Sequence, residues 1–231
     1  MHPVSTAAAS LLLLQCTPSA AQYASAKMTP LRIVAFGTSL TARGGWTGAL
    51  EAALSRCLER PVAVSTVALS GATSNWAVSV VDRVISQSPT VVLIEVSVNN
   101  ASLHRFVSVD RSQQNLARIV DRLRERLPRL RIIEMAMNPV RGIRGLIRPF
   151  LDRYIDGHRD LAWEEGIEFV DHRRAWRRLS EKRLATAIPD GAHPMPEAAA
   201  AVIVPALVAR IAAGNCRNET AAAAETRHHS R

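Results

Sequence analysis

Ser39 follows a short apolar segment and a glycine, in the string Gly37-Thr38-Ser39-Leu40. A serine directly after a buried strand stands where an acyl-transfer enzyme can hold its nucleophile, at the carboxyl end of that strand. Serine after glycine is also ordinary turn chemistry, so the string alone predicts little. Thr41 replaces the second glycine of a Gly-x-Ser-x-Gly nucleophile elbow, which excludes the α/β-hydrolase motif.

The remaining parts of an acyl-transfer site occur far from Ser39 in the chain. Asp190 and His193 are spaced so that the carboxylate can reach the imidazole Nδ1–H across one tight turn, which leaves Nε2 free to accept a hydroxyl proton. Gly71 offers a backbone N–H after a second apolar run, and Asn99 offers a neutral side-chain donor after the most apolar run. Taken singly, each of these residues also fits a turn or a helix cap.

Apolar runs alternate with amphipathic segments along the chain, which indicates parallel strands joined by crossover helices. Strands are predicted at Leu31–Phe36, Pro61–Leu69, Thr90–Ser97, Leu130–Met137 and Ile167–Val170. Helices are predicted at Trp46–Arg60, Ser74–Ser88, Val109–Leu127, Arg148–Glu165, Arg173–Leu184 and Pro196–Ala213. This pattern predicts an α/β fold, a three-layer α/β/α sandwich in a single domain over residues 28–214. Ligands of such folds bind at the carboxyl ends of the strands, where the candidate residues lie.

Four blocks occur in the order Gly37-Thr38-Ser39-Leu40, Gly71, Asn99 and Asp190-x-x-His193. In this order they resemble the SGNH (GDSL-type) hydrolase superfamily, over about Leu31 to Ala213. The resemblance implies a flavodoxin-like sheet and hydrolysis of acyl esters or thioesters with no metal and no cofactor. It implies Ser39 as the nucleophile, His193 as the general base and Asp190 as its orienting partner. The oxyanion hole would comprise the N–H groups of Ser39 and Gly71 and the Asn99 side chain.

The chain departs from the family pattern at two places. Thr38 stands where the family has the Asp of Gly-Asp-Ser-Leu, so a carboxylate that often fixes this loop is missing. Ser97 and Asn100 flank Asn99 where the family commonly has Gly and Asp, so Asn100 is an alternative donor, although the spacing favours Asn99. Neither change removes a reacting group, and we expect activity.

The substrate is less well defined than the chemistry. Trp46 follows the nucleophile block, and Arg141 and Arg144 follow the fourth predicted strand, so Trp46 and Arg141 are candidate substrate-binding residues, although Trp usually packs in cores and Arg usually faces solvent. The prediction is a serine esterase that removes a small acyl group, such as acetyl from a carbohydrate. The alternatives are a lysophospholipase or thioesterase, acting on a lipid or thioester, and a non-catalytic module that binds an anionic glycan or nucleic acid.

The composition fits one enzyme domain. Hydrophobic residues make up 48% of the 231 residues, which excludes disorder for the bulk of the chain. Lys and Arg exceed Asp and Glu by 29 to 20, giving a net charge of +9. The basic residues are spread over predicted amphipathic helices, and no nucleic-acid motif accompanies them, so solvated helix faces explain the charge and no nucleic-acid partner is expected. The oligomeric state is not indicated.

The two ends of the chain differ from this domain. Residues 1–27 contain the apolar run Ala7–Leu14 and small residues up to Ala21, which predicts a secretory leader and an exported, periplasmic or secreted protein. Translation from Met28 would instead give a cytoplasmic protein. The apolar run is too short to span a bilayer. Cys57 is predicted as a small buried hydrophobe, with a Cys57–Cys216 bridge left open, and residues 215–231 are predicted to be a disordered tail.

Overall fold

Five parallel strands form one sheet in the order β2-β1-β3-β4-β5. The structure is a computed structural model, and it describes residues 30–216. The strands are β1 (Leu31–Gly37), β2 (Val62–Ala68), β3 (Val91–Glu95), β4 (Arg131–Ala136) and β5 (Glu168–Asp171). This is the flavodoxin-like strand order, and its switch point lies between β1 and β3.

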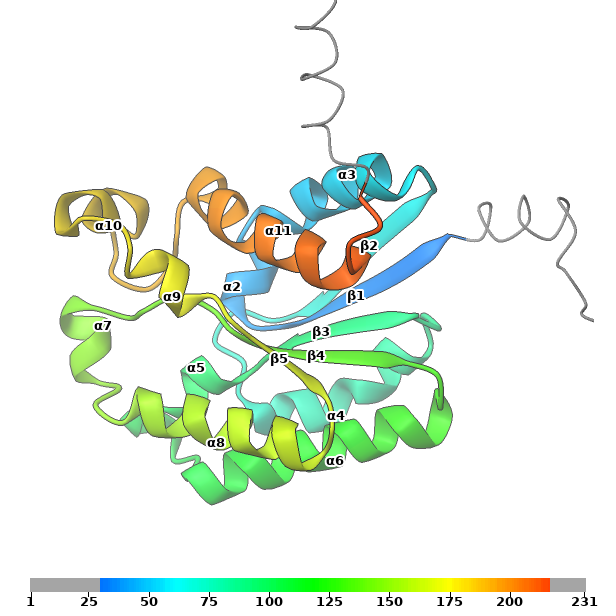
Figure 1. The fold of residues 1–231 in the computed structure, drawn as a ribbon. Coiled ribbons are helices and arrows are strands. Elements are labelled where there is room, and N and C mark those ends of the chain that lie inside the picture. Colours follow the sequence, from blue (N-terminus) through cyan, green and yellow to red (C-terminus); the bar gives the residue numbers. More distant parts are fainter. Residues whose placement is uncertain (1–29, 217–231) are drawn as a thin grey trace, which may run out of the picture.

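Helices cover both faces of the sheet, as Figure 1 shows. One face carries α3 (Trp46–Leu58) and α11 (Pro196–Ala212), and the other carries α4 (Ser74–Ile85), α6 (Val109–Arg126) and α8 (Leu151–Glu164). The shorter elements are α2 (Ser39–Ala42), α5 (Ser97–Asn100), η1 (Leu103–Arg105), α7 (Gly142–Leu146), α9 (Arg173–Trp176) and α10 (Glu181–Ala187). The predicted three-layer α/β/α sandwich is therefore confirmed.

The sheet is buried because its strands are apolar on both sides. In β1, Ile33 and Ala35 pack in the cluster that includes α3 and α11, whereas Val34 and Phe36 pack in the cluster that includes α4 and α6. Every residue of β3 is buried. A strand covered on both faces needs such a continuous apolar run, which is why β3 was the clearest strand in the sequence.

Most predicted elements differ from the observed ones by one to three residues at an end, and two differ in how they lead into the next element. The single helix predicted at Arg173–Leu184 is in fact α9 and α10, because Ser180 adopts an extended conformation and caps α10 by accepting a hydrogen bond from the Arg183 N–H. The strand predicted at Thr90–Ser97 is shorter in the structure, because β3 spans Val91–Glu95 and α5 begins at Ser97.

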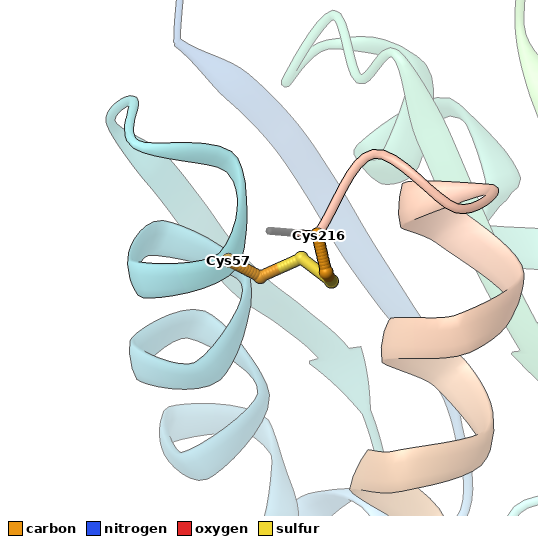
Figure 2. Close-up of a disulfide and its surroundings, with 2 residues drawn as sticks. All are labelled: Cys57 and Cys216. Carbon is orange, nitrogen blue, oxygen red and sulfur yellow. A yellow bond between two sulfur atoms is a disulfide. The ribbon is translucent and has the colours of Figure 1, made fainter. Parts of the chain in front are cut away.

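A disulfide joins Cys57 in the last turn of α3 to Cys216 beyond α11 (Figure 2). The expectation that Cys57 is a small buried hydrophobe is wrong, because its sulfur is bonded and the residue is only half-buried. Residues 215–216, the described part of the predicted tail, are thus attached to the domain. The predicted leader 1–27, Met28 and the tail beyond Cys216 lie outside the described residues. Within residues 30–216, none of the helices combines the length and apolar character needed to cross a membrane.

Candidate active site

Ser39 lies at the carboxyl end of β1, as the first residue of α2. Thr38 caps this short helix, since its backbone is extended and its hydroxyl accepts a hydrogen bond from the Leu40 N–H at 3.3 Å. Trp46 supports the same turn from the core by donating from Nε1 to the Leu40 carbonyl at 2.9 Å. The turn holds Ser39 in a fixed position, with 7% of the residue exposed.

Glu95, on the strand next to β1, holds this turn in place through hydrogen bonds. It is the last residue of β3, pairs in register with Gly37, and is 1% exposed. Its carboxyl group accepts hydrogen bonds from the Thr38 N–H at 2.5 Å, the Thr38 hydroxyl at 3.0 Å and the Thr41 hydroxyl at 2.8 Å. Burial raises the pKa of Glu95 to about 7, although the hydrogen bonds from the two threonines act in the opposite direction.

The same glutamate explains how the chain departs from Gly-Asp-Ser-Leu. A carboxyl group still holds the nucleophile turn, but Glu95 provides it from the neighbouring strand, and Thr38 binds it. Gly37 is required beside it, because a Cβ at Gly37 would overlap the Glu95 side chain. Sequence reasoning missed Glu95, although a single charged residue in the most apolar predicted strand was a usable signal.

Asp190 and His193 lie in the loop between α10 and α11, and this loop places the His193 ring next to Ser39. His193 Nε2 lies 2.9 Å from Ser39 Oγ, and His193 Nδ1 lies 2.7 Å from Asp190 Oδ2. Asp190 Oδ1 also accepts hydrogen bonds from the N–H groups of Ala192 at 2.9 Å and His193 at 2.7 Å. The Nδ1–H tautomer fits these partners, and it leaves the Nε2 lone pair facing the Ser39 hydroxyl.

The loop geometry also fixes the charge of Asp190. Burial acts to raise its pKa, but the hydrogen bonds from the His193 ring and from two backbone N–H groups outweigh burial and hold the pKa well below the usual range. The Asp190 carboxylate is therefore ionised throughout the neutral pH range, and it can stabilise a positive charge on the His193 ring.

Gly71 and Asn99 line the same cavity as Ser39. Gly71 has a left-handed backbone, with φ of +76°, in the turn after β2. The Asn99 side chain is oriented by two contacts, because Oδ1 accepts a hydrogen bond from Arg148 at 3.2 Å and Nδ2 donates to the Ala72 carbonyl at 2.9 Å. An amide nitrogen has two hydrogens, so one Nδ2–H remains for a ligand.

Asn100, the alternative donor, is occupied elsewhere. It is 1% exposed, its Oδ1 accepts a hydrogen bond from the Ser74 N–H at 2.8 Å, and its Nδ2 donates to Ser112 Oγ at 2.6 Å. Ser112 in turn contacts His158, which contacts Glu134, both at 2.7 Å. This second Ser–His–carboxyl set is fully buried and cannot meet a substrate, so it holds α5 in place.

Ser39, Gly71, Asn99 and His193 line one cavity of about 320 Å³ at the carboxyl ends of β1 and β3. This is the switch point of the sheet, where such folds bind ligands. The described residues include no cluster of His, Cys, Asp or Glu suited to a metal ion.

The expected substrate-binding residues are not in this cavity. Trp46 is fully buried behind the nucleophile turn, and the Arg141 side chain forms an ion pair with Glu181 outside the cavity. Arg144, one helical turn further along from Arg141, does line it. Sequence spacing placed these residues near the right strand ends, but the direction of each side chain depends on packing that the sequence pattern does not specify.

The fold and these polar residues at the carboxyl ends of the strands fit a class of protein, the acyl hydrolases with a flavodoxin-like sheet. The model of the GDSL-like lipase/acylhydrolase family matches residues 35–201, and the chain belongs to this family. It is an ester hydrolase. No curated protein matches the chain.

Several solved structures have the same fold. An acetylxylan esterase from Geobacillus stearothermophilus, crystallised as a catalytic mutant, superposes with a TM-score of 0.66 at 19% identity, over 81% of this chain and 97% of that one. A putative GDSL-like lipase from Parabacteroides merdae gives 0.67 at 16% identity, over 81% and 98%. A GDSL-like lipase from Bacteroides thetaiotaomicron gives 0.61 at 18% identity, over 78% and 87%.

Proposed function

We propose that this ester hydrolase is a serine esterase that removes a small acyl group through an acyl-enzyme, with Ser39, His193 and Asp190 as its catalytic residues. The observation that carries the proposal is the continuous pair of hydrogen bonds from Ser39 Oγ to His193 at 2.9 Å and from His193 to Asp190 at 2.7 Å. These distances are those at which a base can take a hydroxyl proton while a carboxylate orients the base.

In the first half-reaction, Ser39 Oγ attacks the acyl carbonyl carbon and its proton moves to His193 Nε2. The carbonyl π electrons move to oxygen, and this oxyanion accepts hydrogen bonds from the N–H groups of Ser39 and Gly71 and from Asn99 Nδ2. When the intermediate collapses, the bond to the alcohol oxygen breaks and that oxygen takes the proton from Nε2. In the second half-reaction, water gives its proton to Nε2 and attacks the acyl-enzyme, which releases the acid and Ser39.

The size and lining of the cavity favour a small acyl group over a long one. The cavity measures about 320 Å³, and Leu40, Val98 and Ile147 are the large apolar residues among those that line it. A long acyl chain would need a continuous apolar wall to compensate for its transfer from a lipid or micelle. Acetyl esters of carbohydrates are the proposed substrate class, and the acetylxylan esterase among the structural neighbours agrees with it.

Hydrolysis of p-nitrophenyl esters tests this function. We expect the acetate to be cleaved with a higher kcat/KM than the octanoate or palmitate, and Ser39→Ala to lower kcat on the acetate on the order of 10⁴-fold or more. A preference for the long esters would indicate the lysophospholipase or thioesterase alternative. Full activity in Ser39→Ala would refute the mechanism, and binding of an anionic polymer without any hydrolysis would indicate a non-catalytic module.

We also propose that the protein is exported to an oxidising compartment. The disulfide between Cys57 and Cys216 supports this, since such bonds persist in secreted and periplasmic proteins and are rare in the cytosol. Thiol titration and N-terminal sequencing of the protein from its native source test it. We expect no free thiol at either cysteine and a chain that begins near Gln22, whereas a cytosolic chain that begins at Met1 or Met28 would contradict the proposal.

A further inference from the structure

Four arginine side chains line the catalytic cavity. They come from three separate parts of the chain: Arg43 ends α2, Arg105 ends η1, and Arg144 and Arg148 lie in and directly after α7. No Asp or Glu side chain of residues 30–216 lines the cavity with them. Four guanidinium groups around a cavity of about 320 Å³, of which only Arg144 forms an ion pair with another of the described residues, favour the binding of anions.

Two of these arginines already have partners in the protein. Arg144 forms an ion pair with Asp190 at 3.3 Å. Arg148 donates to Val98 O at 3.0 Å, to Arg144 O at 2.9 Å and to Asn99 Oδ1 at 3.2 Å, and all three acceptors are neutral. Burial lowers the pKa of Arg148, and the positive charges of Arg144 and Arg105 lower it further. The cluster therefore repels itself, and an anion would relieve that repulsion.

The other two arginines are available to a ligand. Arg43 and Arg105 are exposed, and neither forms an ion pair within the described part of the chain. The Arg105 side chain lies directly against Gly71, because its Nη2 is only 2.9 Å from the position that a Cβ on Gly71 would occupy. Arg43 Nη2 lies 3.2 Å from His193 Nε2, the nitrogen that faces Ser39 Oγ at 2.9 Å.

The position of Arg43 indicates which half of the ester it faces. In the mechanism proposed above, His193 Nε2 gives its proton to the leaving alcohol, so a group beside Nε2 belongs to the alcohol half of the substrate. The planar guanidinium donates several hydrogen bonds in a fork that matches a carboxylate, sulfate or phosphate. An anion bound by Arg43 would accept hydrogen bonds from the N–H groups of the guanidinium. Arg43 would then no longer donate to His193 Nε2, whose lone pair would be free to accept the Ser39 proton.

We propose that the natural substrate is an ester whose alcohol half carries an anionic group, as an acidic sugar does, and that Arg43 and Arg105 bind this group beside the scissile bond. The proposal rests on the esterase function proposed above and specifies its substrate class. Arg144 and Arg148 act as positioning residues, since the first holds Asp190 and the second orients the Asn99 amide.

Two aryl acetates of nearly equal shape test the proposal. The compound 3-acetoxybenzoate carries a carboxylate on the alcohol half, and 3-acetoxybenzamide is its neutral counterpart. We expect kcat/KM to be higher for the benzoate by about tenfold or more, since a hydrogen bond to a charged group corresponds to roughly this factor. The preference should shrink as NaCl is raised from 0.05 to about 0.5 M, because the cavity is open to solvent ions.

The arginines are tested through the ratio of the two kcat/KM values, because a general loss of activity cancels in that ratio. Arg43→Gln and Arg105→Gln should each reduce the ratio several-fold, and the double variant should bring it close to 1. Arg159→Gln is the matched control, since Arg159 is an exposed arginine on α8 outside the cavity and should leave the ratio unchanged.

The outcomes separate this inference from the esterase function. If p-nitrophenyl acetate is hydrolysed through Ser39 but the two aryl acetates react equally, the substrate inference is overturned and the esterase stands. If no acetate is hydrolysed, the small-acyl esterase function proposed above itself fails. Monophenyl succinate carries its carboxylate on the acyl half of the ester. A preference for this compound over phenyl acetate, with no preference for 3-acetoxybenzoate over 3-acetoxybenzamide, would place the anion on the acyl half and overturn the assignment to the alcohol half. A preference that survives in the double variant would overturn the role of Arg43 and Arg105.

Discussion

Replacing Glu95 with glutamine tests how the buried carboxyl group supports the nucleophile turn. The side chain is 1% exposed and binds Thr38 and Thr41 on either side of Ser39. Glutamine has the same shape and fills the same space, but it has no titrating group. Glu95→Gln therefore removes the pH-dependent part of the contribution of this residue to stability and leaves the packing in place.

The size of the effect follows from the pKa of Glu95, which burial raises from the usual 4.5 to about 7. Each pKa unit is worth roughly 1.4 kcal/mol, so the shift corresponds to about 3 kcal/mol. Because the folded-state pKa is the higher one, the folded protein binds more protons than the unfolded chain between pH 4.5 and 7. The favourable contribution of the protonated carboxyl is complete below pH 4.5 and is lost as the pH rises through 7.

Urea unfolding of the oxidised wild type and of Glu95→Gln, at half-unit steps from pH 4 to 8, measures this contribution. We expect the free energy of unfolding of the variant to rise by about 3 kcal/mol relative to that of the wild type between pH 4.5 and 7. Outside that range, we expect the two curves of free energy against pH to run parallel. Other titrating groups occur in both proteins and largely cancel in the difference.

Parallel curves over the whole pH range would refute the argument, since they would show that Glu95 titrates alike in the folded and unfolded states. A difference of the opposite sign would show that the threonine hydrogen bonds outweigh burial. Glu181→Gln is the control for the loss of a carboxyl group at the surface, because the Glu181 side chain is 82% exposed.

Two further predictions concern the oxyanion donor and the disulfide. Asn99→Ala should lower kcat on p-nitrophenyl acetate by about 10²–10³-fold with little change in KM, since the lost hydrogen bond forms in the transition state; an unchanged kcat would contradict the assignment of Asn99 as a donor. The double variant Cys57→Ser/Cys216→Ser should lower the free energy of unfolding in urea by roughly 2–5 kcal/mol, because the bond closes a loop of 159 residues. Its activity without urea should persist, and equal stability with and without the bond would contradict this prediction.

The sheet and the site rim were predictable from sequence because both depend on local patterns. The apolar run that became β3 has the composition of a strand buried on both faces, and strand ends of a parallel sheet meet at one edge. That rule alone brings Ser39, Gly71 and Asn99 together. The spacing of Asp190 and His193 sets their mutual contact within one turn, so their hydrogen bond was also predictable.

The surroundings of the site depend on tertiary packing, which the sequence pattern does not encode. Glu95 reaches Thr38 only because β1 and β3 pair in one particular register. Arg43, Arg105 and Arg148 meet through loops that are distant in sequence, and no periodicity links them. Trp46 has an aromatic side chain beside the nucleophile block, but the start of α3 directs it into the core.

The central claim is that Ser39 is the nucleophile, and mapping of a covalent adduct tests it most directly. The folded protein is treated with a fluorophosphonate probe, digested and analysed by mass spectrometry. We expect one modified residue, Ser39, with labelling lost in Ser39→Ala, strongly slowed in His193→Ala and retained in Ser70→Ala, which removes another hydroxyl of the cavity. Labelling at a different serine, or undiminished labelling of Ser39→Ala, would contradict the account.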